Sequence, residues 1–458
     1  MKTNKKIFGK IELITGSEFI SATDEDRFCY SFDAAGGKSL PDLVVKPANA
    51  EEISKIVVLA NEYSIPIIPR GAGSGFVGGA LPLYGGIVLV LNRMSDILYI
   101  DEDNLTVEVG PGVVTQKLQQ EVEKKGLFYP PDPASLKFSS IGGNVAVNSG
   151  GPRAIKYGVT KDYVLGLEAV LPTGEIIHTG VKTVKGVVGY DLTRLLIGCE
   201  GTLGIITKIL LKLLPKPKTV RTISVIFPEV DDATRAVSEI IHSKIIPATL
   251  EFMDNSAIRC VEDYLQMGLP VEAGAMLLIE VDGDHDVVDK ELNRIESLCK
   301  NYNSQQIIIA ANDKEQEKLW AARRAVSPAL GRLKPTKINE DIVVPRNKIP
   351  HIIKRIKGIA DDFNLTIINF GHAGDGNIHV NVMTDKRNKD EYERAKRAVK
   401  EIFSAVLDLN GTLSGEHGVG LTKSPYIGME IEPVVLQKMK EIKKIFDPNN
   451  IMNPGKIF

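Results

Sequence analysis

The stretch PRGAGSGFVGGALP, Pro69 to Pro82, decides the fold class of this chain. It carries five glycines and lies between two apolar, strand-like runs, IPIIPR before it and GGIVLVL after it. Glycine lets backbone N–H groups approach a phosphate closely and adopt positive φ. A mobile loop is the alternative, but five glycines between two apolar runs are unusual for one. The pattern therefore favours phosphate binding.

The glycine loop differs from the two common nucleotide-binding fingerprints. A dinucleotide fingerprint needs its glycines to open a helix within a βαβ unit, whereas here Pro82 and a further strand follow. No GK[ST] sequence closes the loop, so it is not a Walker loop either. The phosphate expected here therefore belongs to a different class of site.

Two further segments are dense in glycine. They are SSIGGNVAVNSGG, Ser139 to Gly151, which follows PPDP, and GYDLTRLLIGCEGTLGIIT, Gly189 to Thr207. Each lies beside an apolar run, and each alone is a weak signal. Together with the first loop they predict backbone wrapped around one large ligand.

At this point the chain resembles a known family. The segments PRGAGSGFVGG, IGGNVAVNSGG, YGVTKDYVLGLEAVLPTGE and IGCEGTLGIIT are similar, in order and spacing, to the flavin-binding domain of the vanillyl-alcohol-oxidase superfamily. The nearest branch holds glycolate oxidase flavoprotein subunits, D-lactate dehydrogenases and D-2-hydroxyglutarate dehydrogenases. The resemblance runs from about Leu40 to Phe458. It implies an α+β chain with a PCMH-type FAD-binding domain of two α/β subdomains, an α+β substrate or cap domain, and a C-terminal helical segment that returns to the FAD domain.

The resemblance also implies which residues hold FAD. The pyrophosphate would lie along the first loop, at Arg70, Gly71, Ala72, Gly73, Ser74, Gly75 and Gly78. The rest of the cofactor would be lined by Pro131, Asp132, Gly142, Gly143, Asn144, Asn148, Gly150, Gly151, Gly158, Glu200, Gly201, Ile206 and Asn453. Relatives with covalent FAD often carry a histidine in the first loop. This chain has none before His178, which favours non-covalent FAD. One departure from the family is Gly186, which follows Lys185 where relatives often have Asn or Asp.

Histidines gather in two short segments of the C-terminal third. NFGHAGDGNIHVNV contains His372 and His379, and LSGEHGVG places Glu416 beside His417. Because IHVNV alternates, His379 and Asn381 are predicted to share one face of a strand. Two histidines and a carboxylate suit a divalent metal with an open position. The alternative, an ordinary polar histidine at each position, is less favoured because the glycines allow close approach.

The resemblance assigns roles to this set. In relatives with a metal here, the ligands match His372, His379 and Glu416, and zinc or another transition metal is expected. His417 matches the catalytic base and Asn381 a substrate contact. Arg323 matches an arginine that pairs with the substrate carboxylate, a task that suits a bidentate fork. Its neighbour Arg324 is expected to be a solvated helix charge.

The expected reaction is the FAD-dependent oxidation of a D-2-hydroxy acid, lactate- or glycolate-like, to the 2-oxo acid. The hydride would pass to flavin, and the electrons to a separate acceptor, either a redox partner protein or a quinone, because no second redox centre or NAD site is visible. Two alternatives stay open. One is another FAD reaction on the same scaffold, such as ether-lipid synthesis or phenol oxidation. The other is a non-catalytic FAD subunit of an electron-transfer complex.

Composition excludes several classes of protein. The 458 residues carry 56 basic and 58 acidic side chains, a formal charge of -2, so nothing favours nucleic acid or an anionic membrane as partner. Four cysteines without CxxC spacing argue against an iron–sulfur cluster, a zinc ribbon or a disulfide framework. The polar N-terminus and the lack of a long apolar run favour a cytoplasmic protein without a transmembrane segment. A homodimer or a complex subunit is possible.

Four regions are expected along the chain. Residues 1–40 form a helical preamble, 41–218 the FAD-binding domain, 219–410 the cap domain, and 411–458 a segment that completes the active site. The proline-rich LLPKPK, Leu213 to Lys218, marks the main boundary. Beyond it, strands alternate with helices, which predicts a separate α+β domain.

Overall fold

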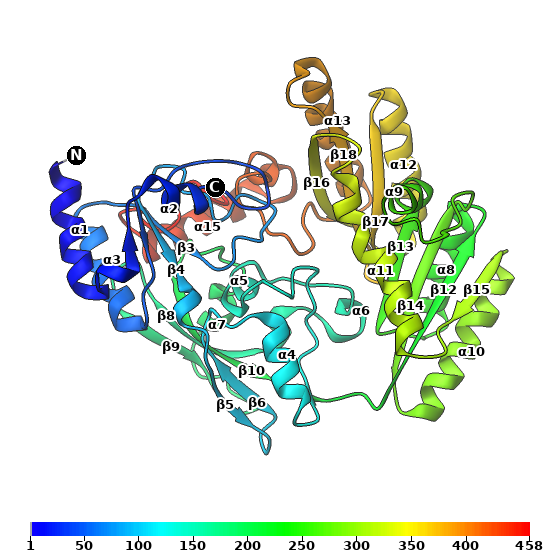
Figure 1. The fold of residues 1–458 in the computed structure, drawn as a ribbon, viewed down its shortest axis with the longest axis horizontal. Helices are drawn as coiled ribbons and strands as arrows, with labels where there is room; N and C mark the ends of the chain where they lie inside the picture. Colours follow the sequence, from blue (N-terminus) through cyan, green and yellow to red (C-terminus); the bar gives the residue numbers. More distant parts are fainter. Residues whose placement is uncertain (1) are drawn as a thin grey trace. The chain divides into compact units, whose positions relative to one another are not determined.

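The computed structural model describes residues 2–458, with side chains from Ile7 onward, as two compact units. The first unit comprises Met1–Ser149, Val159–Lys216 and Glu416–Phe458, and the second comprises Gly150–Gly158 and Pro217–Gly415 (Figure 1). The last 43 residues thus rejoin the first unit, as the fold class implied.

The first subdomain of the first unit is a four-stranded sheet in the order β1-β2-β4-β3. Its strands are β1 (Ile20–Ser21), β2 (Leu43–Val45), β3 (Ile67–Arg70) and β4 (Ile87–Val90). The last three run parallel, so β2 reaches β3 through a crossover helix, α3 (Ala50–Glu62). The first glycine loop leaves the carboxyl end of β3, the edge where open parallel sheets bind ligands.

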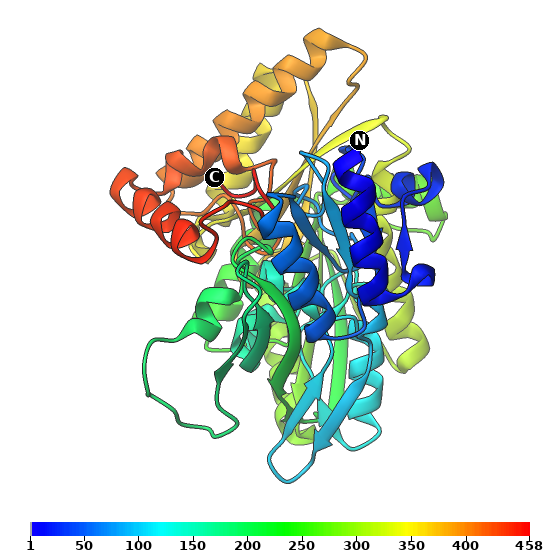
Figure 2. The same ribbon diagram turned by 90° about the vertical axis from the view of Figure 1, so that its left-hand side faces the viewer.

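Helix α3 packs on this sheet through one apolar face. The side chain of Asn49 accepts a hydrogen bond from Glu52 N and so starts the helix. Ile53, Ile56 and Val57 are buried in a core to which α1 (Lys2–Thr15) adds Ile7 and Ile11. In Figures 1 and 2, α1 lies along the outer side of α3.

The second subdomain is a five-stranded antiparallel sheet in the order β5-β6-β10-β8-β9. The strands are β5 (Ile97–Asp101), β6 (Thr106–Val109), β8 (Val164–Val170), β9 (Ile176–Gly180) and β10 (Ile205–Lys212). The short helix α5 (Ile141–Val147) packs against β10. A separate pair of short strands, β7 (Leu127–Phe128) and β11 (Leu214–Pro215), lies in the same unit. The other α-helices of this unit are α2 (Asp24–Cys29), α4 (Thr115–Glu123), α7 (Leu192–Leu196), α14 (Ile427–Glu430) and α15 (Pro433–Phe446).

The connection between β9 and α7 is an exposed loop, drawn as the wide green loop in Figure 2. Val184, Val187 and Val188 are each at least 95% exposed in it. The departure from the family pattern at Lys185 and Gly186 falls in this loop, and neither residue lines the large pocket described below.

The second unit is built on a seven-stranded sheet, all of whose strand pairs are antiparallel, in the order β15-β12-β14-β13-β17-β18-β16. Its strands are β12 (Thr219–Phe227), β13 (Thr249–Asp254), β14 (Ala275–Gly283), β15 (Gln306–Ile309), β16 (Thr336–Val343), β17 (Thr366–His372) and β18 (Asn377–Thr384). The alternation of strands and helices therefore produces an α+β unit, as expected.

Helices cover this sheet in two groups. Helices α9 (Asn255–Leu265) and α11 (Asp313–Leu330) pack on each other and on one face, whose side chains include Met253, Ile368 and Phe370. The second group, in which neighbours contact one another, consists of α8 (Val230–His242), α10 (His285–Asn301), α12 (Ile349–Asp362) and α13 (Lys389–Asp408). The segment Gly150–Gly158, with α6 (Ala154–Tyr157), joins the unit through Tyr157, whose hydroxyl donates to Asp282 Oδ2 over 2.7 Å. Among residues 2–458, none of the helices has an apolar stretch long enough to cross a bilayer.

Candidate functional site

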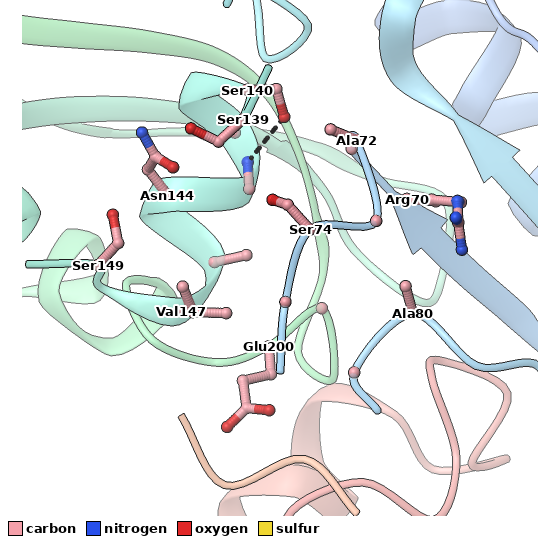
Figure 3. Close-up of a pocket in the computed structure, with 18 of the residues that line it drawn as sticks. Arg70, Ala72, Ser74, Ala80, Ser139, Ser140, Asn144, Val147, Ser149 and Glu200 are labelled. Carbon is pink, nitrogen blue, oxygen red and sulfur yellow. Dashed lines mark hydrogen bonds between the residues drawn. The ribbon is translucent and has the colours of Figure 1, made fainter. Parts of the chain in front are cut away.

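The three glycine segments meet around one pocket of the first unit. Its volume, including the part open to solvent, is about 1300 Å³. Figure 3 shows the first loop, helix α5 and Glu200 around the same space. Twelve residues predicted to bind the cofactor line it: Arg70, Gly71, Ala72, Gly73, Ser74, Gly75, Gly142, Gly143, Asn144, Glu200, Gly201 and Ile206.

Helix α5 forms one wall because glycine lets it approach the neighbouring chain. The Ser140 hydroxyl accepts a hydrogen bond from Gly143 N over 3.3 Å and so caps the helix. A Cβ on Gly142 would come within 2.6 Å of Pro111 Cβ and 3.0 Å of its Cα, so a larger residue cannot fit without a shift. Helix propensity alone does not predict a helix that begins Ile-Gly-Gly, which explains why the sequence pattern did not mark one here.

Arg70 supplies a buried cation at the end of β3. The residue is 6% exposed, its guanidinium carbon lies 5.5 Å from the centre of the Tyr30 ring, and burial lowers its pKa although Asp33 opposes the shift. Its Nη1 atom is buried and makes no hydrogen bond to the described residues. A buried N–H without a partner in a glycine-lined pocket suits an anionic group such as phosphate.

The C-terminal segment reaches the same pocket and is held there by Glu200. The Glu200 carboxylate accepts hydrogen bonds from Val419 N over 2.7 Å and from Gly420 N over 2.8 Å. Burial raises the pKa of Glu200, and these two backbone N–H groups oppose the shift. Asn453 Nδ2 donates to Gly79 O and to Glu200 O over 2.9 and 2.8 Å, which ties the tail to the first loop.

This attachment positions the predicted base. Glu416 and His417 both line the pocket, and the centre of the His417 ring lies 5.1 Å from that of Phe76, which follows the first loop's Gly75. The imidazole is half-buried. A proton acceptor therefore stands in the wall of the large pocket.

A second group of functional side chains occupies one face of the seven-stranded sheet. Residues directly opposite each other on neighbouring strands share a face. The register pairs Phe370 with His379 and His379 with Asp341. One residue beyond the Phe252–Gly371 pair, Glu251 stands opposite His372. Next to them, Asn381 pairs with Asn339, whose Nδ2 donates to Asn381 Oδ1 over 2.7 Å.

His372 and His379 form a close pair on this face. Their Nε2 atoms are 3.4 Å apart, and the two residues are 5% and 7% exposed. Two imidazole nitrogens that bind one metal at roughly 2.0–2.1 Å lie about 3.4 Å apart at a tetrahedral angle. The donor types and their spacing therefore fit a divalent metal. On their other sides, His372 Nδ1 is 2.6 Å from Glu251 Oε1, and His379 Nδ1 is 3.8 Å from Asp341 Oδ1.

Arg323, on α11, is held by the same Glu251. Its Nε and Nη2 donate to Glu251 Oε2 over 2.7 and 2.6 Å, and its guanidinium carbon lies 4.7 Å from the centre of the Phe370 ring. Burial alone would raise the pKa of Glu251, but His372 and Arg323 outweigh burial and hold it below its usual value. Only the Nη1 side of the Arg323 guanidinium is therefore left to bind a further anion. The exposed Arg324 pairs with Glu317 on the helix surface.

Asp341 fixes the point at which the chain leaves the second unit. Its carboxylate accepts from Asn377 Nδ2 over 2.7 Å and from Gly415 N over 3.0 Å. The predicted metal ligand Glu416 is the next residue along the chain after Gly415. The sequence reasoning named neither Asp341 nor Glu251. The alternation in INEDIVV, which places Asp341 on the face of Asn339, was a usable signal for the former.

Comparison with known proteins decides the family. Residues 41–180 match the model of an FAD binding domain, and residues 216–457 match the model "FAD linked oxidases, C-terminal domain". The chain belongs to the FAD-linked oxidases. It is 49% identical to the glycolate oxidase subunit GlcD of Bacillus subtilis, over 97% of this chain and 95% of that one. It is 35% identical to a D-lactate dehydrogenase of Anaerostipes hadrus, over 94% and 92% of the two chains.

Solved structures confirm the fold class of this FAD-linked oxidase. A p-cresol methylhydroxylase with substrate bound matches with a TM-score of 0.81 over 99% of this chain and 96% of that one, at 18% identity. The PCMH-type FAD-binding fold that the family resemblance implied is therefore confirmed. At this identity the likeness concerns the fold alone.

The remaining predicted FAD contacts of this oxidase do not line the pocket. Gly78 faces Leu421, Pro131 O accepts from Gln119 Nε2, and Asn148 Oδ1 accepts from Lys161 N. The residues of this set in the first unit are Gly78, Pro131, Asp132, Asn148 and Asn453, and those in the second unit are Gly150, Gly151 and Gly158. Lining residues that were not predicted include Asp33, Phe76, Pro111, Ser139 and Ser140.

Proposed function

We propose that this FAD-linked oxidase oxidises a D-2-hydroxy acid, lactate- or glycolate-like, to the 2-oxo acid. The observation that carries the proposal is the position of His417, a proton acceptor in the wall of the flavin pocket, next to Phe76. Hydrogen bonds from Val419 N and Gly420 N to the Glu200 carboxylate hold the segment that carries it. The names of the two relatives, a glycolate oxidase subunit and a D-lactate dehydrogenase, supply the substrate class.

The protein's own groups divide the work of this reaction. FAD, when bound in the pocket, supplies the hydride acceptor. An imidazole nitrogen of His417 takes the proton of the substrate hydroxyl, a task for which histidine is the commonest side chain. Arg323 binds the substrate carboxylate through its free edge and so orients the Cα–H bond. Asn381, fixed by Asn339 and by the carbonyl of Ile368, completes the set as a substrate contact.

We also propose a divalent metal, zinc or another transition metal, held by His372, His379 and Glu416. The 3.4 Å between the two Nε2 atoms supports the histidine half. For Glu416, support comes from its position directly after Gly415, which Asp341 binds. A metal held by these residues would supply a positive charge that favours loss of the proton from the substrate hydroxyl.

The cofactor is proposed to be non-covalent, with electrons leaving to a separate redox protein or to a quinone. The pocket wall includes Ser74 in the first loop, and His417 is its one histidine, with no cysteine or tyrosine among the lining residues. Denaturation with acid should therefore release all the flavin into the supernatant. Flavin that stays with the precipitated chain contradicts a non-covalent cofactor.

The decisive experiment is an anaerobic titration of purified protein with a panel of D- and L-2-hydroxy acids. D-lactate or glycolate should bleach the long-wavelength flavin band, and L-lactate should not. Dihydroxyacetone-phosphate ethers and 4-alkylphenols belong in the panel, because bleaching by these alone would favour another chemistry on the scaffold. Failure of every compound to reduce bound FAD would favour a non-catalytic FAD subunit.

A further inference from the structure

We propose that Glu251 is a positioning residue that sets two functional groups at once, the histidine His372 and the arginine Arg323. The inference rests on the proposed function, since it takes His372 as a metal ligand and Arg323 as the group that binds the substrate carboxylate. Glu251 itself touches neither substrate nor cofactor in this assignment.

The carboxylate of Glu251 divides its two oxygens between the two groups. Oε1 lies 2.6 Å from His372 Nδ1, and Oε2 accepts from both Nε and Nη2 of Arg323. The side chain is 1% exposed, so water does not compete for these bonds. A buried carboxylate that loses a partner leaves an uncompensated charge, and the cluster is therefore held together strongly.

This arrangement selects one tautomer of His372. A guanidinium is always charged, so the buried carboxylate beside it is stabilised as the anion, which can only accept hydrogen bonds. His372 Nδ1 must then carry the proton, and the lone pair is on Nε2. That atom faces His379 Nε2 across 3.4 Å. Carboxylates that hold the far nitrogen of a metal-binding histidine do this elsewhere.

Glu251 also restricts Arg323 to one orientation. With Nε and Nη2 bonded to Oε2 and the plane near the Phe370 ring, the Nη1 atom is left, and it makes no hydrogen bond to the described residues. The guanidinium therefore cannot swing to a second position without abandoning a buried anion. One carboxylate thus couples the geometry of the metal ligand to that of the substrate-binding arginine.

The same sheet face offers a matched control. Glu280, on β14, is also buried at 5% exposure, and its Oε1 accepts from Thr222, Gln316 and Trp320 over 2.8, 2.7 and 2.6 Å. It therefore shares the burial and the donor number of Glu251 but contacts neither His372 nor Arg323. Glu280→Gln reports the cost of losing a buried carboxylate on this face.

The first test measures metal affinity with Zn²⁺ alone, by competition against a chromogenic chelator and without substrate. Glu251→Gln keeps the shape but removes the charge, and it should weaken Zn²⁺ binding about 10–100-fold. Glu280→Gln should leave it within twofold of the wild type. Equal affinity in the wild type and Glu251→Gln, or no Zn²⁺ binding by the wild type, overturns the metal half of the proposal.

The second test needs neither metal nor turnover. ¹⁵N NMR of histidine-labelled, metal-free protein, with the His372 signals assigned through His372→Gln, should show the Nδ1–H tautomer in the wild type and its loss in Glu251→Gln. An Nε2–H tautomer in the wild type overturns the proposal. If the tautomer is as expected but no hydroxy acid bleaches the flavin, the proposed function fails while the position of Glu251 stands.

The third test addresses Arg323. Binding of pyruvate, followed by perturbation of the flavin spectrum, should weaken at least tenfold in Glu251→Gln and stay near the wild-type value in Glu280→Gln. Both variants should retain stoichiometric FAD, because the flavin pocket lies in the other unit. Unchanged pyruvate affinity in Glu251→Gln would overturn the substrate half.

Discussion

The pocket proposed to hold flavin and the sheet face of the second unit are built on opposite principles. In the pocket, glycines at Gly73 and Gly142 remove side chains so that the backbone forms the walls, and a Cβ at either position would collide with a neighbour. On the sheet face, polar side chains hold one another, as Glu251 does with His372 and Arg323. The pocket wall therefore tolerates few added side-chain atoms, and the sheet face tolerates the removal of few polar groups.

The difference predicts how variants in each region will fail. A change at a glycine or at Arg70 of the pocket wall should act on cofactor binding and leave the other unit unaltered, whereas a change at His417, in the same wall, should act on the chemistry alone. A change on the sheet face should leave FAD in place and act on metal and substrate. Each prediction below is a way to test that separation.

The largest effect is expected at the residue that serves the chemistry directly. His417→Ala should slow reduction of the flavin by D-lactate about 10²–10⁴-fold, because the hydroxyl proton loses its acceptor. Rapid-reaction spectroscopy under anaerobic conditions measures the rate. FAD should stay bound, and a reduction rate near that of the wild type would remove His417 from the role of base.

The pocket wall should be sensitive to a single methyl group. Gly142→Ala places a Cβ against Pro111 and should lower FAD affinity and cost about 1–3 kcal/mol of stability through overpacking. Gly358→Ala, on α12, is the control, because a Cβ there has no heavy atom within 4 Å and the residue does not line the pocket. Flavin content after gel filtration and thermal midpoints separate the two. Equal behaviour of the two variants would contradict a wall that depends on close backbone approach.

Loss of the buried cation Arg70 should weaken binding of the cofactor through its phosphate. Arg70→Ala removes a charge-assisted hydrogen bond, worth about 1.5–3 kcal/mol, so FAD affinity should fall roughly 10–150-fold. Titration of the deflavinated protein with FAD gives the dissociation constant. Riboflavin, which has no phosphate, should bind the variant and the wild type equally. A matching loss for riboflavin would mean that Arg70 supports the fold and not the phosphate.

The stability of the second unit should depend on pH through one buried carboxyl group. Burial raises the pKa of Asp254 to about 6 from 3.8, against the pull of the backbone N–H groups of Ala257 and Asn369. Since its folded pKa is the higher one, the folded state binds more protons between these values. Stability from this group is complete below about pH 3.8 and is lost as pH rises through about 6.

Asp254→Asn isolates that contribution, because an amide does not titrate. The difference in unfolding free energy between the wild type and Asp254→Asn should shift against the wild type by up to about 3 kcal/mol from pH 4 to pH 6.5, and then stay level. Denaturant titrations at a series of pH values measure it. A difference independent of pH would show that Asp254 keeps an ordinary pKa.

The pocket was largely predictable from the sequence, and the sheet face was not. A glycine-dense segment shows where the backbone itself must approach a ligand, and twelve predicted residues do line the pocket. His379 and Asn381 could be placed on one face from alternation alone. Glu251 could not be linked to His372, because 121 residues separate them and only the pairing of β13 with β17 brings them together.

The expectation for Arg323 shows the same limit. The sequence supports a carboxylate partner for this arginine, but it does not reveal that a carboxylate of the chain, Glu251, already takes two of its nitrogens. Ser139 and Ser140 also line the pocket, beside the predicted Gly142 and Gly143, but the sequence did not mark them as lining residues.

By itself, the sequence determined the family, the α+β class and the glycine walls of the flavin pocket, because these depend on local backbone chemistry and on the order of motifs. Only the tertiary structure decided which buried charges meet, such as Glu251 with His372 and Arg323, and Glu200 with the backbone after His417. The physical reason is that a buried ion pair depends on strand register and chain return, which no short stretch of sequence specifies.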